Sequence, residues 1–202
     1  MSFESGGWGK RKPPTYLTEP ERDRLLAAAA GNPRDHAILT LFAFAGLRLN
    51  ELVMLDRDDV DFAQKRITVR FAKGGKWRRL GLHPRAERAL RAYLATRDDD
   101  NPALFLSRKG PSDAAARRPG AKGRLGRFAI EDLLAKYVAA ADLGRKHVTP
   151  HCLRHTFATT LWRQTRDIQL VQRALGHSRI TTTTIYMHLD DDQMSNAMMA
   201  VV

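Results

Sequence analysis

The chain has 202 residues, 43% of them hydrophobic, which is enough for one folded domain with its own core. Lys and Arg outnumber Asp and Glu by 34 to 22, and the formal net charge of +12 favours a polyanionic partner such as nucleic acid. A single cysteine, Cys152, excludes an intrachain disulfide framework, and no apolar run approaches the roughly 20 residues of a membrane span. Since the N-terminus also lacks a recognisable signal sequence, we expect an intracellular protein.

The N-terminal part predicts a flexible arm followed by helices. Residues 1–15 place basic side chains among glycines and prolines, as in a solvated tail that could also contact phosphates. The segment Thr18-Glu19-Pro20-Glu21 matches a capping box with proline in the first turn, so a helix should begin there. A second helix is expected over residues 33–45, ended by Gly46, and a short one over residues 50–55. The apolar stripe of the second helix is Ile38, Leu41, Phe42 and Ala45.

Residues 60–82 change to an alternating pattern that predicts a β-hairpin. Hydrophobic residues alternate with polar ones on both sides of the turn Lys73-Gly74-Gly75-Lys76, at Ile67, Val69, Phe71, Leu80 and Leu82. The turn is not a phosphate-binding loop, because the residues after it continue a strand instead of beginning a helix.

A basic segment over residues 107–127 follows a helix expected at 84–96 and an extended piece at 104–106. Four glycines and two prolines predict a mobile loop. The loop either follows DNA phosphates or is a solvated insertion. Its basic residues are Arg108, Lys109, Arg117, Arg118, Lys122, Arg124 and Arg127.

The rest of the chain is expected to be helical, over residues 128–141, 150–164, 167–175 and about 181–189. No internal repeat and no long linker divides the sequence. The predicted fold class is therefore mainly α with a small antiparallel β-sheet (α+β). We expect Cys152, Trp77 and Trp162 to be packing residues.

His151 and Arg154 suggest phosphate chemistry. They are three residues apart on a predicted helix, so they share a face and could reach one phosphate together. Arg154 lies at the edge of an apolar stripe, and no acidic residue occurs between 143 and 166. A phosphate would relieve the cost of a half-buried guanidinium, whereas a solvated helix arginine is the alternative.

Tyr186 suggests covalent catalysis when it is considered with its neighbours. Gly176 is the expected left-handed C-cap of a helix, which places His177 on a fixed turn nine residues before the tyrosine. A phenol has a pKa near 10, so its attack on phosphorus needs nearby cations and a proton acceptor. On its own, Tyr186 would more often be a packing or surface tyrosine.

Four short motifs together resemble the tyrosine recombinases, the phage integrase family. They occur in the family's order and at its separations, and the resemblance covers about residues 16–189. Each motif is weak alone, and their combination with a hairpin lysine is highly specific. The motifs are Gly46-Leu47-Arg48-Leu49-Asn50-Glu51-Leu52, His151-x-x-Arg154-His155, Leu175-Gly176-His177 and Tyr186.

The resemblance implies the family's catalytic-domain fold and a site-specific recombinase that needs no metal or other cofactor. Tyr186 would be the nucleophile that forms a 3′-phosphotyrosine and releases a 5′-hydroxyl. Arg48 and Arg154 would hold the non-bridging phosphate oxygens. Lys73 would be the general acid for the departing 5′-oxygen, with Lys76 as the second candidate for that role.

The remaining roles implied by the resemblance concern protons and orientation. His151 would assist proton transfer at the nucleophile, and His177 would donate a hydrogen bond to the phosphate. Glu51 would orient the cluster, and His155 would form a hydrogen bond within the core. Because Cys152 lies between two histidines, a zinc site is an alternative, disfavoured by the absence of a second cysteine and of a glutamate next to the first histidine.

The resemblance also implies double-stranded DNA as partner, a DNA-dependent homo-oligomer that is a tetramer in the synapse, and a cytoplasmic, nucleoid-associated location. No small-molecule substrate is expected. Many members carry a further N-terminal DNA-binding domain, so the chain resembles single-domain members such as the fimbrial inversion recombinases, or is a fragment. Residues 190–202 are expected to form a tail that docks on a neighbouring subunit. The alternative functions are a type IB topoisomerase and a catalytically inactive DNA-binding accessory protein.

Overall fold

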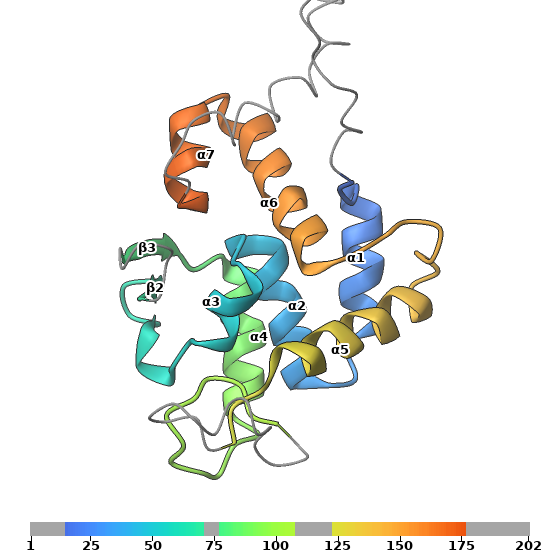
Figure 1. The fold of residues 1–202 in the computed structure, drawn as a ribbon. Coiled ribbons are helices and arrows are strands. Elements are labelled where there is room, and N and C mark those ends of the chain that lie inside the picture. The colour runs from blue at the N-terminus through green and yellow to red at the C-terminus, as the bar shows by residue number, and fades with distance from the viewer. Residues whose placement is uncertain (1–14, 71–76, 108–122, 177–202) are drawn as a thin grey trace, which may run out of the picture.

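The computed structural model describes residues 15–70, 77–107 and 123–176 (Figure 1). The helices are α1 (Glu19–Ala28), α2 (Pro33–Ala45), α3 (Leu49–Val53), α4 (Pro84–Leu94), α5 (Arg127–Ala140), α6 (Pro150–Thr165) and α7 (Ile168–Leu175). A single 3-10 turn, η1 (Arg57–Asp59), precedes the strands β1 (Val60–Asp61), β2 (Arg66–Val69) and β3 (Arg78–Gly81). The predicted class, mainly α with a small antiparallel sheet, is confirmed.

The sheet has the strand order β1-β2-β3, and both pairings are antiparallel. The predicted hairpin is confirmed, with Ile67 opposite Leu80 and Val69 opposite Arg78. The sequence did not predict β1, because two residues are too few to show an alternating pattern. Ile67, Val69 and Leu80 are buried, so one face of the hairpin covers the core.

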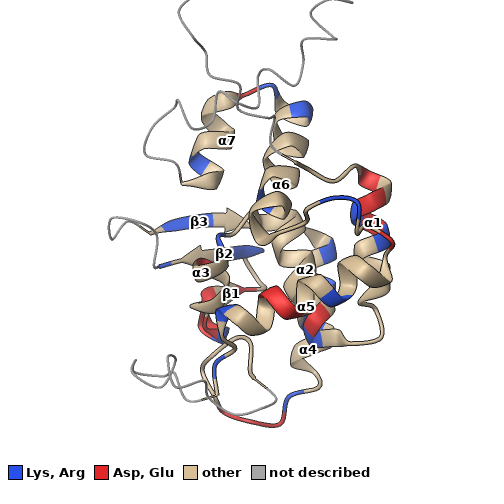
Figure 2. Ribbon diagram, turned by 45° about the vertical axis from the view of Figure 1, so that its right-hand side comes forward, with Lys and Arg blue, Asp and Glu red and all other residues tan. Residues whose placement is uncertain are grey.

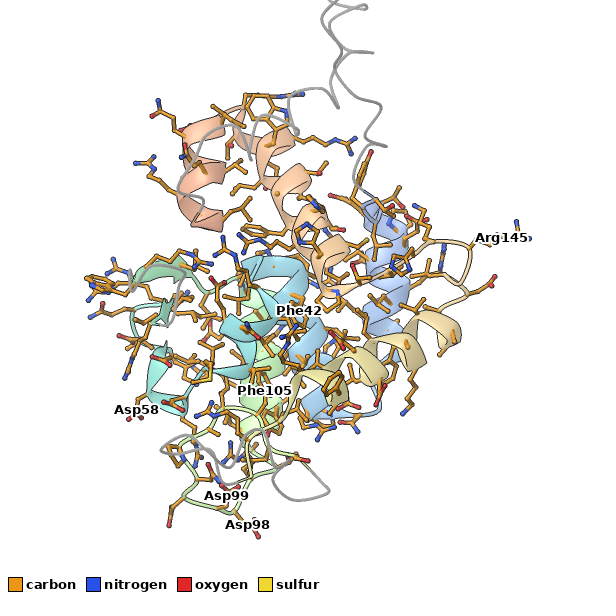
Figure 3. The ribbon with its side chains drawn as sticks, viewed as in Figure 1. Phe42, Asp58, Asp98, Asp99, Phe105 and Arg145 are labelled. Atoms are coloured by element: carbon orange, nitrogen blue, oxygen red, sulfur yellow. The ribbon has the colours of Figure 1, made fainter. Side chains whose placement is uncertain are left out.

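Helix α2 lies at the centre of the core and packs against both α4 and α6. Its predicted apolar stripe is buried, but so are the residues on its other faces, such as Leu39 and Thr40. The Thr40 hydroxyl is satisfied by donating to the His36 carbonyl at 2.7 Å. Phe42 of α2 and Phe105 lie inside the fold (Figure 3), and full burial of such a ring stabilises a fold by about 1.5–3 kcal/mol.

Local capping signals set the helix starts. The Thr18–Glu21 capping box is present, and the Thr149 side chain accepts from the Cys152 N–H at the start of α6. The predicted ends are less accurate, because terminal turns depend on tertiary contacts. The helix expected over residues 50–55 covers 49–53, and the helix expected over 84–96 ends at Leu94.

The segment after α4, expected to be extended at 104–106, bends at Leu104 and Phe105 between two isolated bridges, and it fixes the end of the predicted basic loop. The Ser107 N–H donates to the Gly123 carbonyl, and the Leu125 N–H donates to the Phe105 carbonyl. The prediction of a mobile loop is therefore wrong for residues 123–127, which return to the fold and begin α5. Residues 108–122 lie outside the described part of the chain.

Helices α6 and α7 form a layer above α2, α3 and β3 in the view of Figure 1. Their contact is a small apolar cluster of Ala158, Val171 and Leu175, with Phe157, Leu161 and Trp162 packed against it. Within the described residues, no helix is long and apolar enough to cross a membrane.

Candidate active site

The carboxylate of Glu51 in α3 is the centre of a group of arginines. The Arg48 Nη1 donates to Glu51 Oε1 at 2.8 Å, and the Arg48 backbone N–H donates to Oε2 at 2.8 Å. Arg78 of β3 donates from Nη1 and Nη2 to the two carboxylate oxygens, each at 2.8 Å. The Arg154 Nη1 of α6 lies 3.7 Å from Oε2. We call Arg48, Glu51, Arg78 and Arg154 the arginine cluster; with three cations to one anion, it suits the binding of a phosphate.

Glu51 is paired with Arg48 and Arg78 in a setting that favours its ionised form. Burial by itself raises the pKa of the Glu51 carboxyl, but the hydrogen bonds and charge of Arg78, together with the hydrogen bonds of Arg48, lower it to about 2. A carboxylate with so low a pKa does not take up a proton near neutral pH. The geometry thus supports the expected orienting role.

Arg48 owes its position to the sharp turn between α2 and α3. Gly46 ends α2, as the sequence predicted, and it adopts the left-handed region with φ +58°. A Cβ on Gly46 would lie only 2.2 Å from the Phe157 Cδ1 of α6, so glycine is required there for close packing as well as for backbone conformation. Arg48 then caps α3, with its side chain 32% exposed and therefore open to a ligand.

Arg154 is buried, with its side chain only 4% exposed. It donates from Nη1 to the Gly46 carbonyl at 2.7 Å and from Nη2 to the Leu175 carbonyl. The alternative of a solvated helix arginine is therefore wrong, and the cost of burying Arg154 is relieved within the protein itself. Carbonyls at two helix ends and the Glu51 carboxylate already stabilise it, and Glu51 is distant in sequence.

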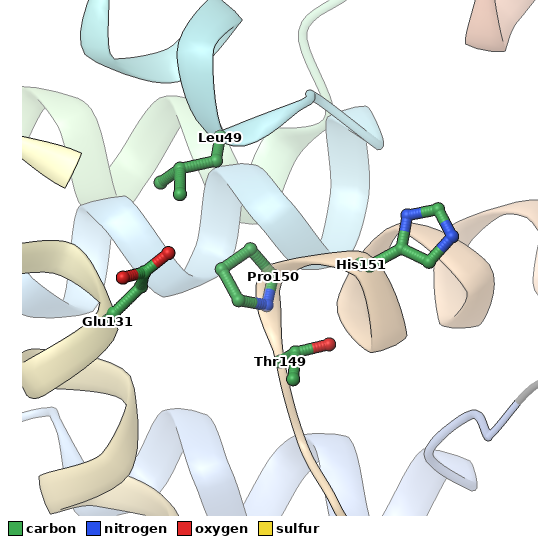
Figure 4. A pocket seen from close by; sticks show the side chains of 5 residues that line it. All are labelled: Leu49, Glu131, Thr149, Pro150 and His151. Carbon is green, nitrogen blue, oxygen red and sulfur yellow. The ribbon is translucent and has the colours of Figure 1, made fainter. Parts of the chain in front are cut away.

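The two histidines of α6 lie beside the cluster. The rings of His151 and His155 meet edge to face, with centroids 4.3 Å apart. His151 is exposed and, with Leu49, Glu131, Thr149 and Pro150, lines a hollow of about 270 Å³ (Figure 4). Partial burial, then the positive charges of Arg154 and Arg48, lower the pKa of His151, which favours the neutral imidazole that can accept a proton.

The burial of His155 and Cys152 indicates structural roles for both residues. Both residues are buried, and Cys152 belongs to the main hydrophobic core, as expected. In residues 15–70, 77–107 and 123–176, no three His, Cys, Asp or Glu side chains gather as a metal site would need.

Acid should destabilise the fold through His155. Burial, followed by the charges of His151 and Arg154, lowers the pKa of His155 from 6.5 to about 4. Below pH 6.5 the unfolded chain therefore binds a proton that the folded chain does not. The contribution of His155 to stability is complete above pH 6.5, and up to an order of 3 kcal/mol is lost as the pH falls to about 4.

Urea denaturation between pH 7.5 and 4 would measure this loss. His155→Gln should flatten the dependence of the unfolding free energy on pH, whereas His147→Gln, at an exposed histidine, should leave it as in the parent chain. Equal slopes for the parent and His155→Gln would contradict this assignment.

Several predicted site residues lie outside the described part of the chain. These are Lys73 and Lys76 in the segment between β2 and β3, His177 and Tyr186 after α7, and five basic residues, Arg108, Lys109, Arg117, Arg118 and Lys122. The described chain ends at the arginine cluster, since the Arg48 Nη2 donates to the carbonyl of Gly176 at 3.2 Å. Gly176 has the predicted left-handed conformation, with φ +63°.

Arg124 and Arg127 were both expected to contact DNA, but they differ in exposure in the structure. Arg124 is buried and donates to the carbonyls of Val53 and Leu55, and its guanidinium pairs with Asp56. Its prediction as a DNA contact is therefore wrong, because its donors are used by the end of α3 and the residues that follow it. Arg127 is exposed at the start of α5.

Arg78 was missed by the sequence analysis, although the alternating pattern contains a signal for it. It shares the inward-facing register of Leu80, and an inward arginine on a strand needs a buried partner. Figure 2 shows basic residues along β2 and β3, of which Arg66 and Arg79 are exposed. Trp77, expected to pack, is instead 62% exposed, with the Arg79 guanidinium 5.1 Å from the centre of its ring.

Comparison with known proteins identifies relatives along almost the whole chain. The model of the Phage integrase family matches residues 15–193. Tyrosine recombinase XerC of Caldanaerobacter subterraneus subsp. tengcongensis is 37% identical over 191 residues, which cover 91% of this chain and 50% of that protein. Tyrosine recombinase XerA of Pyrococcus horikoshii is 35% identical over 184 residues, covering 91% of this chain and 60% of that protein. The chain thus spans about half to three fifths of the length of these relatives.

Solved structures have the same fold. The XerA recombinase crystal structure matches with a TM-score of 0.76 and 35% identity, over 92% of this chain and 65% of that one. The XerH site-specific recombinase in a post-cleavage complex with palindromic difH substrate matches with a TM-score of 0.75 and 27% identity, over 94% of this chain and 54% of that one. Since the family model covers well over half of the sequence, the chain belongs to the phage integrase family of tyrosine recombinases.

Proposed function

We propose that this chain is the catalytic part of a site-specific recombinase that cleaves and rejoins double-stranded DNA through a 3′-phosphotyrosine. The arginine cluster carries the proposal. Arg48 and Arg154 come from segments far apart in sequence and meet at one carboxylate, beside His151 with its lowered pKa. Gly176, which contacts Arg48, precedes Tyr186 by ten residues.

The proposed reaction is an exchange of phosphate esters. The Tyr186 Oη forms a bond to phosphorus while the bond from phosphorus to the 5′-oxygen breaks. His151 assists removal of the phenol proton, and a lysine donates a proton to the 5′-oxygen. The new ester retains the energy of the phosphodiester, so the reverse attack by a 5′-hydroxyl rejoins DNA without a nucleotide cofactor.

Arg48 and Arg154 would stabilise the charge that develops on the non-bridging oxygens. Guanidiniums suit this role because their paired N–H groups match two phosphate oxygens. His177 would add a hydrogen bond to the same phosphate. Glu51 would keep the guanidiniums aligned without reacting, in agreement with its low pKa.

Lys73 is the proposed general acid, with Lys76 as the alternative. Both belong to the segment that joins β2 to β3. Val69 lies before this segment and pairs with Arg78 after it, so the two ends of the segment lie side by side. Arg78 ties β3 to the cluster, which supports a role for this segment near the phosphate.

DNA is the proposed partner, held by Arg127 and the five basic residues between 108 and 122. The XerH crystals contain difH DNA in pre- and post-cleavage complexes, and XerH is 26–27% identical to this chain. By analogy we propose that subunits assemble on DNA, as a tetramer in the synapse, in the cytoplasm. The arm at 1–15, the domain at 16–189, the docking tail at 190–202 and the likeness to fimbrial inversion recombinases remain predictions.

A nicked-duplex trap tests the proposed function. The substrates are duplexes of random sequence, each with a nick just downstream of the varied site. Cleavage releases a short fragment that carries the 5′-hydroxyl. Without that hydroxyl the DNA cannot be rejoined, so the protein stays covalently attached. The parent chain should yield adducts that resist denaturing detergent and share a recoverable sequence. Tyr186→Phe should yield none and should bind the recovered duplex as the parent does, because only the hydroxyl is removed.

Other outcomes would favour other functions. Adducts formed by Tyr186→Phe would show that another residue is the nucleophile. Binding by the parent chain without any adduct would favour the inactive accessory protein. Relaxation of supercoiled plasmids that lack the recovered sequence, by dilute protein, would favour the type IB topoisomerase.

A further inference from the structure

Arg78 joins the three structural elements that surround the proposed phosphate site. It belongs to β3, it pairs with both carboxylate oxygens of Glu51 in α3, and its Nε donates to the Ala174 carbonyl of α7 at 3.0 Å. We propose that Arg78, a residue outside the four motifs, is a positioning residue that aligns Arg48 and the end of α7 for attack on the phosphate. This inference rests on the proposed function and adds a residue to its machinery.

The strand register directs Arg78 to this position. Side chains alternate along β3, so Arg79 points outward beside Trp77, while Arg78 points inward with Leu80. The Arg78 side chain is 11% exposed, and it is the first residue of β3 after the segment that carries the two candidate lysines. A displacement of Arg78 would therefore also displace the start of this strand.

Glu51 transmits the position of Arg78 to Arg48. One oxygen, Oε1, accepts from both Arg48 Nη1 and Arg78 Nη1 at 2.8 Å. The planar pair with Arg78 fixes the rotation of the carboxylate and with it the direction in which Arg48 is held. A lysine could not form two parallel hydrogen bonds and reach the Ala174 carbonyl as well, because its ammonium is a single point.

The same guanidinium packs on the end of α7. A Cβ built on Gly176 would lie 3.1 Å from Arg78 Nη1 and 3.3 Å from Arg78 Cζ, so the side chain lies directly against this glycine. Gly176 is the last residue before His177, a proposed phosphate ligand. Arg78 thereby supports the backbone from which His177 and Tyr186 follow.

The test compares two buried arginines that are changed to lysine. Arg97 is the matched control, since it is also buried, pairs with Asp99 through two nitrogens and donates to backbone carbonyls. It belongs to the segment after α4, near Asp99 at the opposite end of the molecule from α6 and α7 (Figure 3). The readouts are the single-turnover rate of adduct formation on saturating nicked duplex, the DNA dissociation constant and the thermal midpoint.

Arg78→Lys should slow adduct formation about 100-fold, as expected for a small misplacement of reacting groups, with DNA affinity unchanged. Arg97→Lys should lower the thermal midpoint but leave the rate per folded molecule unchanged. Millimolar guanidinium should restore part of the rate of Arg78→Ala. The control, Arg97→Lys, should reach its full rate without added guanidinium. This rescue separates positioning from a general loss of stability.

The inference is overturned if Arg78→Lys cleaves at the parent rate, or if both lysine variants slow cleavage only in proportion to their unfolded fraction. Absence of guanidinium rescue in folded Arg78→Ala would also count against it. Failure of the proposed function has a different signature, because the parent chain itself would then form no adduct.

Discussion

Glu51→Ala should destabilise the fold by about 3–5 kcal/mol, the usual cost of removing one partner from a buried ion pair. The Arg78 and Arg154 side chains, 11% and 4% exposed, would remain buried without their shared carboxylate. Their mutual repulsion would add to this cost. Urea denaturation at pH 7 measures the change in unfolding free energy.

Glu51→Gln is the matched variant for Glu51→Ala. It keeps the size of the side chain and one acceptor oxygen, but it removes the negative charge. Its unfolding free energy should fall between those of the parent and the alanine variant. Parent-like stability of Glu51→Ala would mean that the three guanidiniums do not depend on this carboxylate, and the arginine cluster described above would be wrong.

Arg48→Ala should slow formation of the covalent adduct about 10²–10³-fold, the effect of removing one donor to the charge of a transition state. Its effect on stability should be small, roughly 1 kcal/mol or less, because its side chain is 32% exposed. Single-turnover cleavage and urea denaturation of the same preparation provide both values.

Arg154→Ala should lose both activity and stability. It would slow cleavage to a similar degree, and it would also leave the carbonyls of Gly46 and Leu175 without their donor, at about 1–3 kcal/mol each. If Arg154→Ala were as stable as Arg48→Ala, the buried position of Arg154 and its hydrogen bonds to the two carbonyls would be contradicted. Undiminished cleavage by Arg48→Ala would contradict the assignment of the phosphate site.

Features encoded by neighbouring residues could be predicted from the sequence. The capping box at Thr18, the helix end at Gly46, the left-handed Gly176 and the Ile67–Leu80 hairpin each depend on local backbone preference or on a repeat of two residues. The bounds of α2 were predicted without error, because proline begins the helix and glycine ends it. These signals were sufficient for the fold class and for placing the motifs at 46–52 and 151–155 on their elements.

Features that depend on contacts between distant segments could not be predicted. The segment around Arg154 contains no acidic residue, so only the family resemblance, and no local pattern, suggested Glu51, over a hundred positions away, as a neighbour of this arginine. Arg124 lies in a basic, glycine-rich run, and only the Asp56 carboxylate and two backbone carbonyls reveal it as buried. The alternating register places Arg78 on the same face as Leu80, but its partners Glu51 and Ala174 are distant in sequence and could not be predicted.

The central claim is that Arg48 and Arg154 act on the negative charge of one scissile phosphate. The most direct measurement repeats the cleavage assay with a nicked duplex whose scissile phosphate is a methylphosphonate, in which an uncharged methyl replaces one non-bridging oxygen. We predict that Arg48→Ala and Arg154→Ala then cleave at nearly the parent rate, since little charge remains to be stabilised. If both variants are as impaired on this duplex as on ordinary DNA, the two arginines do not act on the phosphate charge.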